Sequence, residues 1–239
     1  MGFYSNSNVE AQPIGIDLTT IMRQVYLWMT LGLAVSAVTA FGLAQSGAAI
    51  YFYRNPILML VTILAYIILA FTLQPVIMRA QPSVGAILYL AVTALLGVML
   101  SSIFLTYRLG TISLAFVATT ATFGTMSFVG YTTKRDLSQM GSILMMGLIG
   151  LIIASVVNIF LASSTLDWII TYAGVLIFVG LTAYDTQWIK NFAGRAATSG
   201  DPNMPQRVAL IGAFHLYLDF VNLFLFILRI LGGGRGGRR

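Results

Sequence analysis

Charged residues are scarce in this chain, because Asp, Glu, Lys and Arg make up only 8% of its 239 residues, whereas a soluble domain carries roughly a quarter. Hydrophobic residues account for 58%, and they are gathered into long segments rather than spaced at helical or strand periods. A soluble fold cannot bury that much apolar surface. The composition therefore excludes a soluble protein and predicts an all-α membrane protein.

Cysteine is absent, which excludes disulfide bonds, thiolate metal sites and thiol nucleophiles. The single histidine, His215, has no cluster of other metal ligands around it in the sequence, and this argues against a zinc site. We therefore expect no bound cofactor.

The polar segment 1–24 lacks the basic start and the small-residue cleavage site of a secretory signal, so we expect the first apolar segment to remain in the mature protein.

A bilayer core needs about 20 apolar residues per helix. Segments of that length fill a transmembrane domain at 25–231, and residues 232–239 form a flexible Gly/Arg tail. The seven predicted spans are Val25–Ala44, Pro56–Ile77, Val84–Leu105, Ile112–Tyr131, Ile143–Leu161, Trp168–Ile189 and Ala209–Leu231.

The orientation follows from the basic residues, which concentrate in cytoplasmic loops. Seven of them lie near span ends on the N-terminal side and two lie opposite, which predicts a cytoplasmic N-terminus in the cell (inner or plasma) membrane. The four arginines of the C-terminal end fall on the opposite side and narrow the excess to seven against six. The Gly/Arg tail is too short to indicate a nucleic-acid partner. The apolar spans indicate that the lipid bilayer surrounds the protein. The residues counted are Arg23, Arg79, Lys134, Arg135, Lys190, Arg195 and Arg207 against Arg54, Arg108, Arg229, Arg235, Arg238 and Arg239.

Two acidic residues, Asp185 and Asp219, lie inside predicted spans, whereas the other five lie at or outside span ends. A charged side chain in mid-span costs about 2.5–3.5 kcal/mol and is retained mainly where it faces the interior of the bundle. A loop predicted at Lys190–Val208 joins the last two spans, and at 1.5 Å per residue Asp185 lies about 7 Å and Asp219 about 15 Å inside that face. Each Cα–Cβ bond tilts toward the N-terminus of its own helix, which brings the two carboxyls within reach of each other.

Two neighbouring carboxylates cannot both ionise cheaply, so the pair is expected to share a proton and to titrate as a unit. Once deprotonated, the pair presents a double negative charge, which a hard cation such as Ca²⁺ prefers. The prediction is a proton sensor on an ion pathway at Asp185 and Asp219. Ca²⁺ would be a transported or weakly bound ion there.

Three further polar residues lie near this pair in the predicted arrangement. Arg79 ends the second span at the same face, where it either pairs with Asp185 as a latch or extends to the lipid headgroups. His215 and Asn222 stand four residues before and three after Asp219, on one stripe of the last span. His215 is either a second proton-sensitive group or a histidine satisfied by a neighbouring helix.

Three stretches carry a family resemblance: residues 123–138 with Met140-Gly-Ser142, Tyr184–Lys190, and Leu216–Phe224 with Leu228-Arg229. They resemble the Bax inhibitor-1 family, also called the transmembrane Bax-inhibitor-motif family, in its bacterial branch. The resemblance covers nearly the whole chain and implies seven transmembrane helices, arranged as two three-helix layers around a central C-terminal helix. It also implies a pH-sensitive calcium-leak channel with Asp185 and Asp219 as the sensor and Arg79 as the latch. An acidic residue in the second span of some relatives has no counterpart here.

Three functions remain open at this point. The first is a pH-sensitive Ca²⁺ leak, and the second is a cation/proton exchanger that uses the same aspartates. The third is a non-transporting regulator that binds a membrane protease or another membrane protein. We do not expect an enzyme, because Asp185 and Asp219 lack the Gly-x-Gly-Asp context of intramembrane aspartyl proteases.

Overall fold

The computed structural model describes residues 17–233, which form eight helices and no strand. Seven of these helices are long and apolar enough to cross a membrane, which confirms the predicted number of spans. Residues 1–16 and 234–239, which hold most of the polar N-terminal segment and of the Gly/Arg tail, lie outside the described residues. The helices are α1 Leu18–Gln45, α2 Ala48–Arg54, α3 Pro56–Arg79, α4 Pro82–Thr106, α5 Leu109–Thr132, α6 Ser138–Leu161, α7 Ser164–Ala197 and α8 Met204–Gly232.

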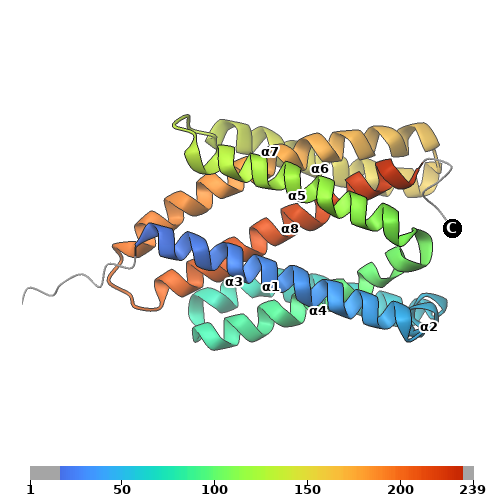
Figure 1. Ribbon diagram of the computed structural model, residues 1–239, viewed down its shortest axis with the longest axis horizontal. Helices are drawn as coiled ribbons and strands as arrows, with labels where there is room; N and C mark the ends of the chain where they lie inside the picture. The colour runs from blue at the N-terminus through green and yellow to red at the C-terminus, as the bar shows by residue number, and fades with distance from the viewer. Residues whose placement is uncertain (1–16, 234–239) are drawn as a thin grey trace, which may run out of the picture.

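The seven long helices form two layers with α8 between them (Figure 1). One layer contains α1, α3 and α4, and the other contains α5, α6 and α7. The last helix packs most extensively against α7, α1 and α5, so it contacts both layers. In an 18-residue apolar segment of each helix, 61% of the residues of α8 are buried, against 11% of those of α3 and 6% of those of α6. The predicted arrangement of two three-helix layers around a central C-terminal helix is therefore confirmed.

Helices α3 and α6 present apolar side chains on nearly every face. In α6 only Gly141 is buried, while large residues such as Ile153 and Phe160 are exposed. A helix that is hydrophobic all round belongs in lipid or in a large core. These exposed side chains therefore face the hydrocarbon of the bilayer.

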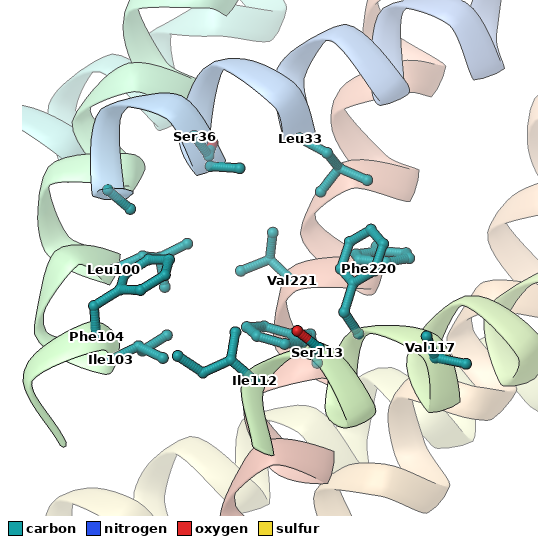
Figure 2. Close-up of a pocket in the computed structure, with 14 residues that line it drawn as sticks. Leu33, Ser36, Leu100, Ile103, Phe104, Ile112, Ser113, Val117, Phe220 and Val221 are labelled. Carbon is teal, nitrogen blue, oxygen red and sulfur yellow. The ribbon is translucent and has the colours of Figure 1, made fainter. Parts of the chain in front are cut away.

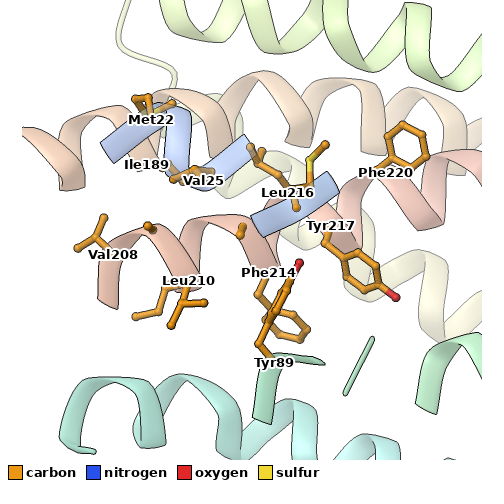
Figure 3. Close-up of a cluster of buried hydrophobic side chains, with 14 of the residues drawn as sticks. Met22, Val25, Tyr89, Ile189, Val208, Leu210, Phe214, Leu216, Tyr217 and Phe220 are labelled. Atoms are coloured by element: carbon orange, nitrogen blue, oxygen red, sulfur yellow. The ribbon is translucent and has the colours of Figure 1, made fainter. Parts of the chain in front are cut away.

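Aromatic and hydroxyl side chains join α8 to the first layer. Tyr217 and Phe214 of α8 lie against Tyr89 of α4 (Figure 3), with ring centroids 6.3 and 6.5 Å away and edge-to-face geometry. Tyr217 also shares a 2.6 Å hydrogen bond with Ser36 of α1, which donates at 2.7 Å to the carbonyl of Thr93. Buried tyrosine hydroxyls need such partners, and these contacts set the position of the central helix.

A second chain of hydroxyl groups joins the two layers directly. The Tyr26 hydroxyl of α1 lies 2.6 Å from Ser127 Oγ of α5, which lies 3.0 Å from Thr186 Oγ1 of α7. Thr186 also donates to the carbonyl of Thr182 at 2.7 Å. Because Thr186 follows Asp185, this chain holds the acidic part of α7 in place.

Replacing Tyr26 by Phe is expected to lower the free energy of unfolding by about 1 kcal/mol, the usual contribution of one hydrogen bond between spans. Thermal unfolding in detergent measures this loss. Thr30→Val is the matched control, because Thr30 Oγ1 donates only to the Tyr26 carbonyl of its own helix. Equal losses in the two variants would contradict a role for the Tyr26–Ser127 contact.

Three features of the chain differ from the prediction. Helix α1 begins at Leu18, inside the segment 1–24 that was predicted to precede the first span. Helix α2 was not predicted, because its seven residues are too few to span a bilayer. The loop predicted at Lys190–Val208 is wrong in extent: α7 continues to Ala197 and α8 begins at Met204. Hydropathy marks the edge of the apolar segment, whereas the helix itself continues through polar residues beyond it.

Candidate functional site

Two antiparallel helices, α7 and α8, bring Asp185 and Asp219 together. Asp219 is 4% exposed, and the side chain of Asp185 is 15% exposed. Both side chains line the same cavity. The structure thus places the two aspartates beside one cavity inside the bundle, as the tilt of their Cα–Cβ bonds predicts.

Asp219 Oδ2 is buried and accepts no hydrogen bond from any residue between 17 and 233. A buried carboxylate without donors is costly, and a second carboxylate nearby adds repulsion unless one of the two holds a proton. Ionisation of both carboxyls at this place is therefore costly.

His215 contacts the acidic pair through Asp185. Its Nδ1 lies 3.3 Å from Asp185 Oδ2, and its ring stacks on Trp188 with centroids 5.1 Å apart and planes inclined by 23°. Two residues of α7, one turn apart, therefore hold the imidazole. The sequence left two alternatives for His215. The partner on a neighbouring helix is present in the structure, whereas a role as a second proton-sensitive group stays a prediction.

Arg79 and Asn222 lie in the same region without contacting the carboxylates. Arg79, at the end of α3, forms no hydrogen bond or ion pair within the described part of the chain, so the expected Arg79–Asp185 contact is not formed in this structure. Asn222 donates through Nδ2 to the carbonyl of Leu218 at 2.8 Å, within its own helix. His215 contacts Asp185, whereas the family resemblance had suggested Arg79 for that place.

A cavity of about 1050 Å³ adjoins the aspartate pair. Residues of α3 and α6, one helix from each layer, line it together with residues of α7 and α8. The lining positions recur at intervals of three and four residues, which places them on one face of each helix. The polar residues among them are Gln74, Arg79, Tyr184, Asp185, Trp188, His215, Asp219 and Asn222.

The cavity offers oxygen ligands but no tight metal site. Among residues 17–233 no three His, Cys, Asp or Glu side chains cluster closely enough to hold a metal ion. Two carboxylates with the neutral oxygens of Gln74 and Asn222 are the ligand type that Ca²⁺ accepts. Such a set suits passage or weak binding of a hard cation.

The opposite side of α8 carries a smaller cavity of about 310 Å³ between α1, α4 and α5 (Figure 2). Its lining is apolar, with Leu33, Phe104 and Phe220 pointing into it and only two serines, Ser36 and Ser113, among the lining residues. No titratable side chain lines it. Of these two cavities, only the polar one offers charged side chains to a solute.

Sequence reasoning missed three polar residues of this cavity, which are Gln74, Tyr184 and Trp188. Trp188 stands three residues after Asp185 and so faces the same side of α7, which was a signal available in the sequence. Gln74 is a polar residue within the apolar α3, one turn before Arg79, and it carried the same kind of signal.

Comparison with known proteins agrees with this arrangement. A family model described as "Inhibitor of apoptosis-promoting Bax1" matches residues 18–236. The inner membrane protein YbhL of Escherichia coli is 45% identical over 219 residues, covering 91% of this chain and 93% of that protein. Uncharacterized proteins of Borreliella burgdorferi and Deinococcus radiodurans are 41% and 39% identical, each over 90% of this chain and over 92% and 90% of their own lengths. This chain therefore belongs to the Bax inhibitor-1 family, as a multi-pass membrane protein.

Proposed function

We propose that this protein is a pH-sensitive Ca²⁺ leak of the membrane, with the cavity between α3 and α6 as part of the ion path. The observation that carries the proposal is the presence of Asp185 and Asp219 together in the lining of that cavity. A buried acidic pair in a membrane span is expensive to maintain. Gain or loss of a proton changes the net charge of such a pair, which can switch the site between two states.

Protonation changes what the pair offers to a cation. With a shared proton, the pair carries one negative charge and its oxygens are partly occupied by the hydrogen bond. Without that proton, two negative charges face each other and a divalent cation relieves their repulsion. Ca²⁺ occupancy and proton occupancy of the pair are therefore mutually exclusive, which links flux to pH.

Arg79 supplies a second cationic group to the same cavity. In the proposed cycle, Arg79 pairs with the acidic residues in an alternative state and blocks cation access. Arg79→Gln is expected to change Ca²⁺ flux by about fivefold or more at a fixed pH, the lower end of typical coupling between two sites.

The same variant should leave the unfolding temperature nearly unchanged, because Arg79 forms no ion pair within residues 17–233. Flux in proteoliposomes and thermal unfolding in detergent measure the two effects. A large loss of stability without a change in flux would contradict the latch.

The direct test is Ca²⁺ flux into proteoliposomes that contain the purified protein and an internal Ca²⁺ indicator, measured between pH 5 and pH 8. The proposal expects a flux that changes by about fivefold or more across this range. Flux that does not vary with pH would reject it.

Stoichiometric proton movement against Ca²⁺ would instead assign a cation/proton exchanger. The same acidic pair supports that alternative, because a site that exchanges a proton for a cation is what an exchanger requires. A pH indicator inside the same vesicles distinguishes the two. Complete absence of Ca²⁺ movement would leave only a non-transporting role.

A further inference from the structure

A third pocket, of about 230 Å³, lies beside the loop 133–137 that joins α5 to α6, at the end of the bundle where α7 and α8 are also joined (Figure 1). Its lining includes the basic side chains Lys134, Arg135 and Lys190 and one acidic side chain, Asp136. Three positive charges and one negative charge leave this loop pocket with a net charge of +2. It shares no residue with the cavity beside the aspartate pair.

Two side chains of α7 hold the loop in place. Gln187 accepts the Leu137 N–H through Oε1 and donates through Nε2 to the Arg135 carbonyl, both at 2.8 Å. Lys190, one turn further along α7, donates through Nζ to the Tyr131 carbonyl at 2.7 Å and lies 4.9 Å from the centre of the Tyr131 ring. A loop that is already fixed loses little conformational entropy when it binds a ligand. The loop pocket is therefore organised before a ligand arrives.

The positive charges of the loop pocket are open to a ligand. Lys134 and Arg135 are exposed, and their side chains form no ion pair or hydrogen bond within the described residues 17–233. Lys190 uses one of its three N–H donors on a backbone carbonyl of α5, so two donors remain. The Asp136 carboxylate instead binds the start of α6, where its Oδ1 accepts from the N–H and the hydroxyl of Ser138 at 2.9 and 2.6 Å.

We infer that the loop pocket binds the phosphate of an anionic phospholipid headgroup. An arginine offers a planar fork of N–H donors that matches phosphate oxygens, and lysines add point charges. Helix α5 ends at Thr132 and α6 begins at Ser138, and both are long and apolar enough to cross a membrane. The loop between them therefore lies at the membrane surface, where clusters of basic residues meet anionic headgroups.

The surroundings of the loop pocket favour a lipid over a soluble phosphate compound. Its volume of about 230 Å³ is below the roughly 300–1,000 Å³ of ordinary small-molecule sites, but it accommodates a single phosphate group. The acyl chains of a lipid would remain in the bilayer beside α6, where Ile143 and Met146 are both 64% exposed. An amphiphilic ligand therefore matches both the charged loop and the apolar helix that follows it. This inference does not depend on the proposed Ca²⁺ leak.

Native mass spectrometry of the full chain in detergent tests the inference. The probes are dioleoyl phosphatidylglycerol and dioleoyl phosphatidylcholine, which have the same acyl chains but differ in net charge. We expect the parent protein to retain phosphatidylglycerol about tenfold better than phosphatidylcholine, the effect of one charge-assisted hydrogen bond. No Ca²⁺ is needed for this measurement, so it remains decisive if the protein carries no Ca²⁺ flux.

Substitutions decide whether the retained lipid occupies the loop pocket. Lys134→Gln with Arg135→Gln should lower the retention of phosphatidylglycerol by about tenfold or more. The unfolding temperature should change little, because neither side chain has a partner within residues 17–233. Arg23→Gln with Arg195→Gln is the matched control, since it removes two exposed positive charges near the same end of the bundle but outside the pocket. This control should keep the parental preference.

Three results would overturn the inference. One is a parent protein that retains both lipids equally, and another is a control variant that loses as much phosphatidylglycerol as the pocket variant, which would indicate a general attraction to positive charge. The third comes from thermal unfolding in detergent without added lipid. Stabilisation by millimolar inorganic phosphate that Lys134→Gln with Arg135→Gln abolishes, together with equal retention of the two lipids, would assign the pocket to a soluble phosphate compound.

Discussion

Replacing both Asp185 and Asp219 by Asn is expected to abolish the pH dependence of Ca²⁺ flux. Asn keeps the size of the side chain but neither ionises nor shares a proton in this range. The variation of about fivefold or more expected for the parent between pH 5 and pH 8 should fall to no measurable variation. Proteoliposome flux measured at several pH values on both sides of neutrality provides the comparison.

A matched control removes the same two charges elsewhere in the chain. Asp167→Asn with Asp201→Asn changes two carboxylates that are 49% and 37% exposed and pair with Arg229 and Arg207. The Asp167–Arg229 pair is exposed on both sides, and such pairs contribute roughly 0–1 kcal/mol. Asp201 is itself exposed, although its partner Arg207 is largely buried, and Asn keeps its size, so this variant should fold and keep the parental pH profile. Loss of the profile in the control, or its survival in the Asp185/Asp219 variant, would contradict a sensor at the buried pair.

Replacing Gly130 by Ala is expected to cause the largest loss of stability from a single methyl group. Helix α5 crosses α7 at this point so closely that a Cβ on Gly130 would collide with the backbone carbonyl of Ala183 and lie 2.9 Å from its Cα. Backbone cannot move aside as a flexible side chain can. The expected loss is about 3 kcal/mol, the upper part of the usual range for overpacking, measured by thermal unfolding in detergent.

Gly124 of the same helix is the control, because a Cβ there would meet nothing within 4 Å. Gly124→Ala should be neutral or stabilising by about 0.5–1 kcal/mol, since Ala favours the helix. Comparable destabilisation in the two variants would show that close packing against Ala183 does not set the α5–α7 contact. Because Ala183 lies two residues before Asp185, Gly130→Ala should also disturb the site.

The number of spans was predictable because hydropathy reports directly which segments can lie in lipid. The same signal could not locate the end of α7, since Lys190 and Asn191 leave the apolar segment while the helix continues to Ala197. The central position of α8 came from the resemblance to the Bax inhibitor-1 family. Hydropathy alone could not have shown it, because the mean hydropathy of α8 is no higher than that of its neighbours α1 and α7.

The acidic pair was predictable because two carboxylates in apolar spans have few acceptable surroundings, and depth along two antiparallel helices follows from the rise per residue. The cationic partner was not predictable in the same way. Arg79 and His215 both reach the depth of Asp185, and the choice between them depends on helix rotation and on where α3 sits relative to α7. Only coordinates provide those two quantities.

The central claim is that Asp185 and Asp219 share one proton inside the bundle, and infrared difference spectroscopy tests it most directly. A protonated carboxyl has a carbonyl stretch that is separate from the bands of carboxylates and amides. At pH 7 the account predicts this band in the parent protein, its shift in D₂O, and its absence from the Asp185→Asn/Asp219→Asn variant. A parent spectrum that lacks the band at neutral pH, or a band that the double substitution leaves in place, would contradict the account.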